Sequence, residues 1–235
     1  MTLSPAESYA LIKTRSKFPK TKKFAESFPF ELDPFQIEAC HALESGKGVL
    51  VAAPTGAGKT IVGEFAVDLV INSGGKCFYT TPIKALSNQK FQELSSKYGE
   101  SKIGLLTGDT SINSEAQIVI MTTEVLRNMI YSNSSTINDL KYVVMDEVHY
   151  LADKFRGAVW EEILIHLSEA VQVISLSATV SNAEEFGEWL QTVRGDTEVI
   201  VSEIRPVPLY QHVLFGNRLL DLFGDNQKLN PELTR

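Results

Sequence analysis

The feature that most constrains this chain is a glycine-rich stretch, Ala53-Pro54-Thr55-Gly56-Ala57-Gly58-Lys59-Thr60. It follows an apolar run at 49–52 and precedes a segment in which apolar residues recur at helical spacing from 61 to 70. A strand, a glycine loop and a helix N-terminus in this order form a phosphate-binding loop. Its backbone amides point at the phosphates, Lys59 contacts the outer phosphates, and the Thr60 hydroxyl ligates Mg²⁺. The stretch therefore predicts binding of a nucleoside triphosphate with Mg²⁺.

The composition suits a globular protein with one large α/β core. The 235 residues are 43% hydrophobic and 22% charged. Cys40 and Cys77 do not have the spacing of a zinc site, so we expect two buried thiols in a reducing compartment. Neither a membrane-length apolar run nor a signal-peptide pattern is present in the sequence, which predicts a cytoplasmic protein without a membrane contact.

The charge is unevenly distributed along the chain. A net charge of −7 argues at first against a nucleic-acid partner. Residues 13–23, however, contain six basic side chains and no acidic one. We therefore assign residues 1–27 to a basic N-terminal arm, which either touches a phosphate backbone or is a solvated, mobile tail.

Periodicity predicts alternating helices and strands after the arm. A first helix begins at Pro34 and ends before Gly46. Strands are expected at Cys77–Thr80, Ile103–Leu106, Ile118–Met121, Tyr142–Met145, Val171–Leu176 and Glu198–Val201, and helices near Pro82–Ser96, Glu124–Ile130, Val159–Leu167 and Ala183–Leu190. Because these strands are apolar on both faces and helices separate them, the pattern predicts a mostly parallel central sheet with helices on both faces. The two prolines of Arg205-Pro206-Val207-Pro208 indicate a linker from residue 204 to residue 235.

Two carboxylates follow one of these expected strands, in the segment Asp146-Glu147-Val148-His149. Hydrolysis of a nucleoside triphosphate needs an acid that holds Mg²⁺ and a base that orients the attacking water. Asp146 fits the first role and Glu147 the second. Either residue alone is more often a solvated carboxylate at a strand end, but the upstream glycine loop favours the catalytic interpretation.

Two further polar segments are predicted to connect the site to its surroundings. His149 has no second His or Cys at ligand spacing, which favours a hydrogen-bonding or coupling role over a metal-binding one. Ser177-Ala178-Thr179 follows another expected strand, at the edge where α/β sheets bind ligands. The hydroxyls of Ser177 and Thr179 are therefore candidates for hydrogen bonds to the 146–149 segment.

Taken together, these segments resemble motifs I, II and III of superfamily 2 helicases. The segments 28–36, 81–90, 106–109, 121–127, 156–162 and 205–209 are similar to those of the superkiller-type DExH-box RNA helicases, in particular the bacterial HelY-type branch. The resemblance extends from about Phe28 to about Phe215. It implies a RecA-like P-loop NTPase domain over residues 28–203, the first of two such domains, followed by the start of an interdomain linker.

The resemblance also implies specific ligand contacts. Gln36 would hydrogen-bond the adenine edge and Phe30 would stack on its face, which makes the nucleotide ATP; a core-packing role for Phe30 is the alternative. A groove for single-stranded nucleic acid, with RNA favoured over DNA, would be lined by Pro82, Lys84, Gly108, Thr123 and Glu124. Such a groove contacts phosphates and sugars through amides and hydroxyls, so it tolerates any base sequence and an acidic protein.

Enzymes of this family bind ATP between two RecA-like domains, and the second domain supplies arginine fingers. The chain contains none of the second-domain motifs, so we expect the isolated chain to bind ATP and Mg²⁺ with little hydrolysis and no unwinding. The predicted function of the whole enzyme is ATP-dependent RNA unwinding. The alternatives are a DNA helicase, and a non-catalytic, nucleotide-gated RNA-binding module. Intact Lys59 and Glu147 argue against the last alternative for the parent protein, although it can describe the isolated chain.

Overall fold

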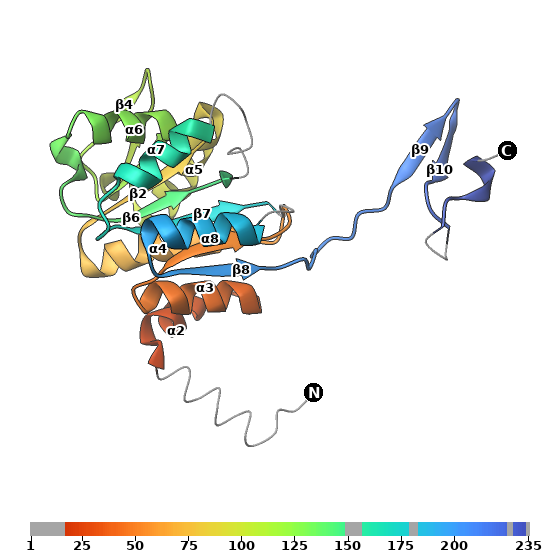
Figure 1. The fold of residues 1–235 in the computed structure, drawn as a ribbon, viewed down its shortest axis with the longest axis horizontal. Coiled ribbons are helices and arrows are strands. Elements are labelled where there is room, and N and C mark those ends of the chain that lie inside the picture. The colour runs from red at the N-terminus through yellow and green to blue at the C-terminus, as the bar shows by residue number, and fades with distance from the viewer. Residues whose placement is uncertain (1–16, 149–156, 179–182, 225–227, 234–235) are drawn as a thin grey trace. The chain divides into compact units, whose positions relative to one another are not determined.

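The computed structural model describes residues 17–148, 157–178, 183–224 and 228–233. The chain divides into a first unit that ends at Ile204 and a second unit that begins at Arg205. The first unit is built on an eight-stranded sheet with the order β4-β3-β5-β2-β6-β7-β1-β8 (Figure 1). Its strands are β1 (Gly48–Ala52), β2 (Lys76–Thr81), β3 (Ile103–Leu106), β4 (Ser111–Ile112), β5 (Ile118–Thr122), β6 (Leu140–Met145), β7 (Gln172–Ser177) and β8 (Thr197–Val201).

All neighbouring strands of this sheet are parallel except β3 and β4. The prediction of a mostly parallel sheet is therefore confirmed. The expected strands differ from the observed ones by at most two residues, at the start of β6. β4 was not expected, because two exposed residues are too short a run to show a period in the sequence.

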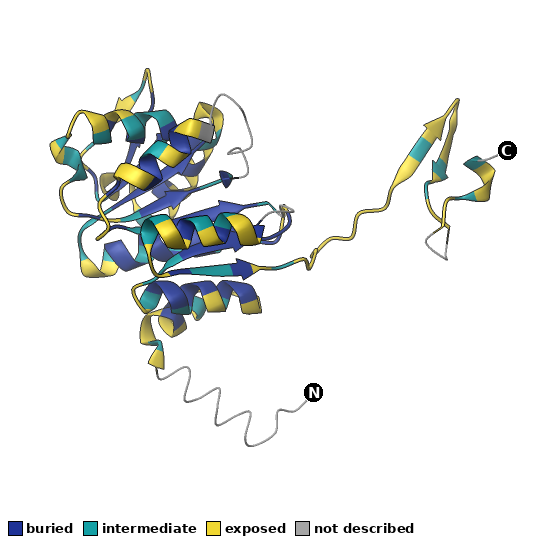
Figure 2. Cartoon of the chain, in the orientation of Figure 1, coloured by how far each residue is buried: buried dark blue, intermediate teal, exposed yellow. Residues whose placement is uncertain are grey.

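Helices cover both faces of the sheet, as Figure 2 shows by the buried strands between exposed helix surfaces. They are α2 (Pro19–Ala25), α3 (Pro34–Glu44), α4 (Thr60–Ser73), α5 (Lys84–Tyr98), α6 (Thr123–Tyr131), α7 (Gly157–His166) and α8 (Ala183–Arg194). One core cluster joins the sheet to α2, α3, α4 and α5, and a second joins it to α6, α7 and α8. Strand β1 alternates between them, with Val49 and Val51 in the first cluster and Leu50 in the second.

Part of the expected N-terminal arm is packed onto the first unit. Helix α2 buries Thr21 and Phe24, and Phe24 belongs to the first core cluster. The backbone amides of Lys20 and Thr21 donate hydrogen bonds of 2.9 and 2.8 Å to the Glu44 carboxylate at the end of α3. The interpretation as a solvated tail is therefore wrong for Pro19–Ala25, because one aromatic side chain anchors a segment whose composition is otherwise basic.

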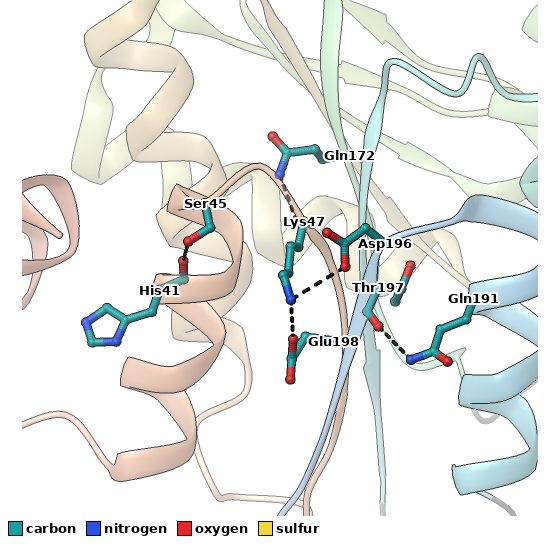
Figure 3. A network of polar contacts seen from close by, with 8 residues as sticks. All are labelled: His41, Ser45, Lys47, Gln172, Gln191, Asp196, Thr197 and Glu198. Carbon is teal, nitrogen blue, oxygen red and sulfur yellow. Dashed lines mark hydrogen bonds and ion pairs between the residues drawn. The ribbon is translucent and has the colours of Figure 1, made fainter. Parts of the chain in front are cut away.

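The N-terminal end of β1 is fixed by a polar network at the sheet edge opposite the glycine loop (Figure 3). The Lys47 ammonium lies 2.9 Å from a Glu198 carboxylate oxygen and 3.5 Å from one of Asp196. The Gln172 side-chain amide donates to the carbonyls of Lys47, at 2.8 Å, and Leu43, at 3.2 Å. These contacts join the turn after α3 to β7 and β8, so they set the position from which β1 runs toward the glycine loop.

The second unit contains a hairpin where the sequence predicted a linker. Strands β9 (His212–Phe215) and β10 (Arg218–Asp221) pair antiparallel around a turn with Gly216 at φ 59°. Residues 202–211, which include both prolines, form neither helix nor strand, in accord with the proline argument. The predicted linker covered all residues from the prolines up to 235. The hairpin was therefore not predicted, although both prolines precede it and neither lies within its strands.

The two cysteines are buried, as the sequence predicted, and burial raises the pKa of both thiols. Within the part of the chain that the structure describes, no helix is long and apolar enough to span a membrane.

Candidate functional site

The predicted site segments meet at one edge of the sheet, because each follows the carboxyl end of a parallel strand. The order of the strands divides this edge into two halves. The adjacent strands β1, β7 and β6 lead to the glycine loop, to Ser177 and to Asp146. The adjacent strands β3, β5 and β2 lead to the predicted nucleic-acid residues, which are Pro82, Lys84, Gly108, Thr123 and Glu124. The half predicted to bind the nucleotide (the nucleotide half) and the half predicted to bind nucleic acid (the nucleic-acid half) therefore lie side by side.

Backbone conformation shapes the glycine loop. Gly56 has φ 85° and Gly58 has φ 82°, in the left-handed region that residues with a Cβ rarely adopt. The Ala57 amide donates to the Pro54 carbonyl at 3.1 Å, and the Ala53 amide donates to the Ser177 carbonyl at 3.1 Å. The loop is thus a tight turn joined to the end of β7, and it leads directly into α4, whose first residue is Thr60.

Lys59 is buried against its own loop. Its ammonium donates to the carbonyls of Ala53, at 2.8 Å, and Pro54, at 3.1 Å. Burial lowers the pKa of Lys59, and the charges of Glu147 and Asp146 act in the opposite direction. A cation that is held by loop carbonyls and is influenced by the charges of two carboxylates is suited to contact the outer phosphates of a triphosphate.

Gln36 connects α3 to the glycine loop. Its side-chain oxygen accepts a 2.8 Å hydrogen bond from the Asp33 amide, and its nitrogen donates to the carbonyls of Gly58, at 3.0 Å, and Ala57, at 3.4 Å. The side chain therefore caps the helix and supports the loop. Its contact with adenine stays a prediction.

Phe30 lies on the surface and is 54% exposed, which rules out the core-packing alternative. Its ring centroid is 5.4 Å from that of Phe28, which is 5.1 Å from the buried Phe24. An exposed ring with a buried aromatic support is suited to stacking on a planar ligand. Stacking on adenine stays a prediction.

The carboxylate of Asp146 is held on both oxygens. Oδ2 accepts a 2.9 Å hydrogen bond from the Tyr79 hydroxyl, and Oδ1 accepts a 3.0 Å hydrogen bond from the Glu147 amide. Burial raises the pKa of Asp146, and the hydrogen bond from Tyr79 opposes this effect. Glu147 has φ 57°, a strained conformation for a residue with a side chain, and such strain concentrates at functional sites.

The donor set at this edge fits Mg²⁺ better than a structural metal. Among the described residues, no group of three or more His, Cys, Asp or Glu side chains could enclose a metal ion. Mg²⁺ in phosphoryl-transfer sites is bound by one or two protein oxygens together with water and substrate phosphates. Asp146 and Thr60 supply that type of incomplete donor set.

Of the residues with a predicted coupling role, Ser177 is buried and accepts the hydrogen bond from Ala53. His149 and Thr179 lie outside the described residues, so their roles stay predictions.

The nucleic-acid half contains two helix N-termini. Helix α6 begins at Thr123, directly after β5, and helix α5 begins at Lys84, separated by two residues from the end of the neighbouring strand β2. The Thr123 hydroxyl is buried and donates to the Thr81 carbonyl at 3.2 Å, so it already has a partner within the protein. The exposed Lys84 ammonium lies 2.5 Å from an Asp109 carboxylate oxygen.

Helix N-termini bind phosphate groups, which supports the predicted groove. Pro82 is buried at the end of β2, whereas Gly108 is exposed after β3 and Glu124 is half-buried on α6. The structure brings these segments together, and their contact with nucleic acid stays a prediction.

Two residues with contacts in the site were not identified from the sequence. Tyr79 binds the predicted Mg²⁺ ligand Asp146, and Asp109 binds Lys84. A signal for Tyr79 was available, because a tyrosine in an apolar strand requires a hydrogen-bond partner for its hydroxyl when it is buried. The identity of that partner depends on how β2 packs against β6.

The fold and site define a P-loop nucleotide-binding domain, and comparison with known proteins gives its family. The chain belongs to the DEAD/DEAH box helicase family, whose model matches residues 33–186. It is 62% identical over 218 residues to "Probable helicase HelY" of Mycobacterium leprae, across 91% of this chain and 24% of that protein. It is 46% identical over 205 residues to "Antiviral helicase SKI2" of Saccharomyces cerevisiae, across 87% of this chain and 16% of that protein.

A solved structure supports the RecA-like fold. The chain resembles the DUF1998 helicase MrfA bound to DNA with a TM-score of 0.63 and 24% identity, across 78% of this chain and 29% of the other. The chain spans about a quarter or less of the length of the curated relatives described above.

Proposed function

We propose that this chain is the ATP-binding part of an ATP-dependent RNA helicase, with residues 28–203 as its first RecA-like domain. The observation that carries the proposal is the arrangement of β1, β7 and β6. Their adjacent ends bring the glycine loop beside Asp146 and Glu147, and Lys59 lies within the electrostatic influence of both carboxylates. This arrangement supports the proposal that the glycine loop binds phosphate, that Asp146 binds the metal and that Glu147 is the base.

Each residue has a role in hydrolysis under this proposal. The glycine loop and Lys59 bind the triphosphate, and Thr60 and Asp146 hold Mg²⁺, which neutralises charge on the phosphate oxygens when it is bound. Glu147 accepts a proton from the water that attacks the γ-phosphorus in line with the leaving oxygen. Phe30 and Gln36 contact the adenine.

RNA is the proposed nucleic acid because of the relatives. Similar proteins carry the names "DExH-box ATP-dependent RNA helicase DExH15 chloroplastic", from Arabidopsis thaliana, and "ATP-dependent RNA helicase mtr4", from Schizosaccharomyces pombe. The MrfA structure contains DNA, and this observation favours a DNA helicase as the second candidate. A groove that binds the phosphodiester backbone accepts either sugar unless it contacts the 2′-hydroxyl. The cytoplasmic location expected from the sequence stays a prediction.

The test is ATP turnover with and without saturating single-stranded RNA. It compares this chain with a form extended through a second RecA-like domain of roughly 200 residues. We expect only the extended form to hydrolyse ATP and RNA to accelerate the reaction. Glu147→Gln in that form should abolish turnover and retain ATP binding. Equal turnover by the short chain would show that the catalytic arginine lies within these 235 residues or is unnecessary. It would refute the proposal that two domains form the catalytic site together.

Two controls separate the alternatives. Single-stranded DNA of the same length replaces RNA in a binding assay, and equal affinity would favour the DNA candidate. ATP-dependent RNA binding by an extended form that does not hydrolyse ATP would instead identify a nucleotide-gated binding module.

A further inference from the structure

The side chain of Tyr79 reaches the predicted Mg²⁺ site from the interior of the sheet. Tyr79 lies on β2 and is fully buried. Strand β2 pairs with β6 in a register that places Thr80 opposite Met145, the residue before Asp146. The 2.9 Å hydrogen bond from the Tyr79 hydroxyl to Asp146 Oδ2 therefore crosses between two neighbouring strands at their carboxyl ends.

The ring of Tyr79 is held in place by both helices that flank it. On α4, a Cβ atom at Gly63 would lie only 3.0 Å from Tyr79 Cε2, so the ring lies directly against the helix backbone. On α5, the ammonium of the largely buried residue Lys90 lies 5.6 Å from the ring centroid and 2.6 Å from a Glu93 carboxylate oxygen. A ring packed on both sides presents its hydroxyl at a fixed point.

A fixed donor matters because Mg²⁺ demands near-ideal octahedral geometry. Asp146 can rotate about its side-chain bonds unless its oxygens are held. The Glu147 amide holds Oδ1 and the Tyr79 hydroxyl holds Oδ2, so the remaining lone pairs of the carboxylate keep one direction. Such outer partners of metal ligands commonly affect metal affinity about 10- to 100-fold.

We propose that Tyr79 is a positioning residue for Mg²⁺: it orients the Asp146 carboxylate toward the metal of the Mg²⁺–ATP complex. The inference rests on the proposed function, because it assumes that Asp146 binds Mg²⁺. It adds a requirement that Asp146 alone does not impose, namely that the carboxylate be held by the neighbouring strand.

The test measures binding and not catalysis. A fluorescent ATP analogue is titrated into the 235-residue chain in excess EDTA, and Mg²⁺ is then titrated into the complex. Tyr79→Phe removes one oxygen atom and keeps the packed ring. Tyr98→Phe is the matched control, because the Tyr98 hydroxyl is buried and has no hydrogen-bond partner among the described residues.

We expect the metal-free nucleotide affinity of Tyr79→Phe to stay within about twofold of the wild-type value. The variant should need about 10-fold more Mg²⁺ than the wild type to reach half of the maximal Mg²⁺-dependent increase in nucleotide binding. Tyr98→Phe should match the wild type in both measurements. An unchanged Mg²⁺ requirement in Tyr79→Phe would overturn the proposal. An equal loss of metal-free and Mg²⁺-dependent affinity would also overturn it, because that result indicates general damage.

A double-mutant cycle separates this inference from the proposed function. In an Asp146→Asn background, Tyr79→Phe should have no further effect on the Mg²⁺ requirement. A full additional effect in that background would show that Tyr79 acts elsewhere. If the wild-type chain shows no Mg²⁺-dependent enhancement, the proposed site itself fails, and this result is visible before any variant is compared.

Discussion

The contact between Gln36 and the glycine loop predicts that the two loop glycines differ in their tolerance of alanine. Gly56 and Gly58 have nearly the same backbone conformation, with φ of 85° and 82°. A Cβ atom at Gly56 would meet nothing within 4 Å, whereas one at Gly58 would lie 2.7 Å from the Gln36 side-chain nitrogen. Alanine at Gly56 therefore introduces backbone strain alone, and alanine at Gly58 also displaces Gln36.

The magnitudes follow from these geometries. Left-handed backbone costs an L-residue about 1 kcal/mol, which applies to both variants. Gln36 is only 3% exposed, so a displaced amide cannot exchange its bonds to the Gly58 carbonyl and the Asp33 amide for water. Losing these bonds costs about 1 to 2 kcal/mol more. Gly58→Ala should therefore be less stable than Gly56→Ala by about 1.5 kcal/mol, which is roughly 4 °C in melting temperature for a domain of this size.

The assay is thermal and urea denaturation of both variants, alone and combined with Gln36→Ala. Removing the Gln36 amide removes the obstruction, so Gly58→Ala should then cost no more than Gly56→Ala. Equal stability of the two single variants would refute the reasoning. A persistent difference in the Gln36→Ala background would likewise show that the obstruction is not the cause.

Three further substitutions test the site. Glu147→Gly should give a fold about 1 kcal/mol more stable than Glu147→Ala in urea denaturation, because both remove the carboxylate and only glycine is unstrained at φ 57°. Phe30→Ala should weaken ATP about 10-fold by calorimetry and leave the affinity for inorganic triphosphate unchanged, since stacking on a base contributes about 1 to 3 kcal/mol. Its melting temperature should not change, because the ring is largely exposed. Lys84→Met should weaken single-stranded RNA binding and reduce the slope of log affinity against log salt by about 0.7.

Each of these expectations has a contrary outcome. An alanine variant at position 147 that is at least as stable as the glycine variant would show that the backbone there is not strained. Equal losses of ATP and triphosphate affinity would place Phe30 away from the base. An unchanged salt slope would show that Lys84 contacts no phosphate and that its partner is Asp109 alone.

Local sequence patterns predicted the sheet well, because a strand buried on both faces is a run of apolar residues that a glycine or a helix interrupts. They failed where one residue decided the structure. The buried Phe24 anchors α2, but its contribution was not recognised because the segment around it is mostly basic in composition. The hairpin of β9 and β10 follows two prolines that are incompatible with strand interiors, and no strand was predicted after them. The assignment of residues 204–235 to an interdomain linker stays a prediction.

The candidate site also contains some features that the sequence predicted and others that it did not. The positions of the glycine loop, Asp146 and Ser177 were predictable, because ligand-binding residues follow the carboxyl ends of parallel strands. The left-handed conformation of Glu147 and the hydrogen bonds of Gln36 to the loop were not. They depend on how α3 and β6 pack against distant segments, and no pattern within a window of neighbouring residues contains that information.

The boundary between the two predicted halves of the site lies between the paired strands β2 and β6, and hydrogen bonds at their carboxyl ends cross it in addition to the ladder of the sheet. Besides the bond from Tyr79 to Asp146, the Asp146 amide donates to the Thr80 carbonyl at 3.0 Å, and the Thr80 hydroxyl donates to the Val144 carbonyl at 3.1 Å. Strand β2 leads within a few residues to Pro82 and to the N-terminus of α5, where nucleic acid is proposed to bind. A displacement of β2 on the nucleic-acid side must therefore move the donor that holds Asp146 or break its hydrogen bond. Because a packed core does not deform smoothly, this strand pair is a direct physical connection between the two proposed binding sites.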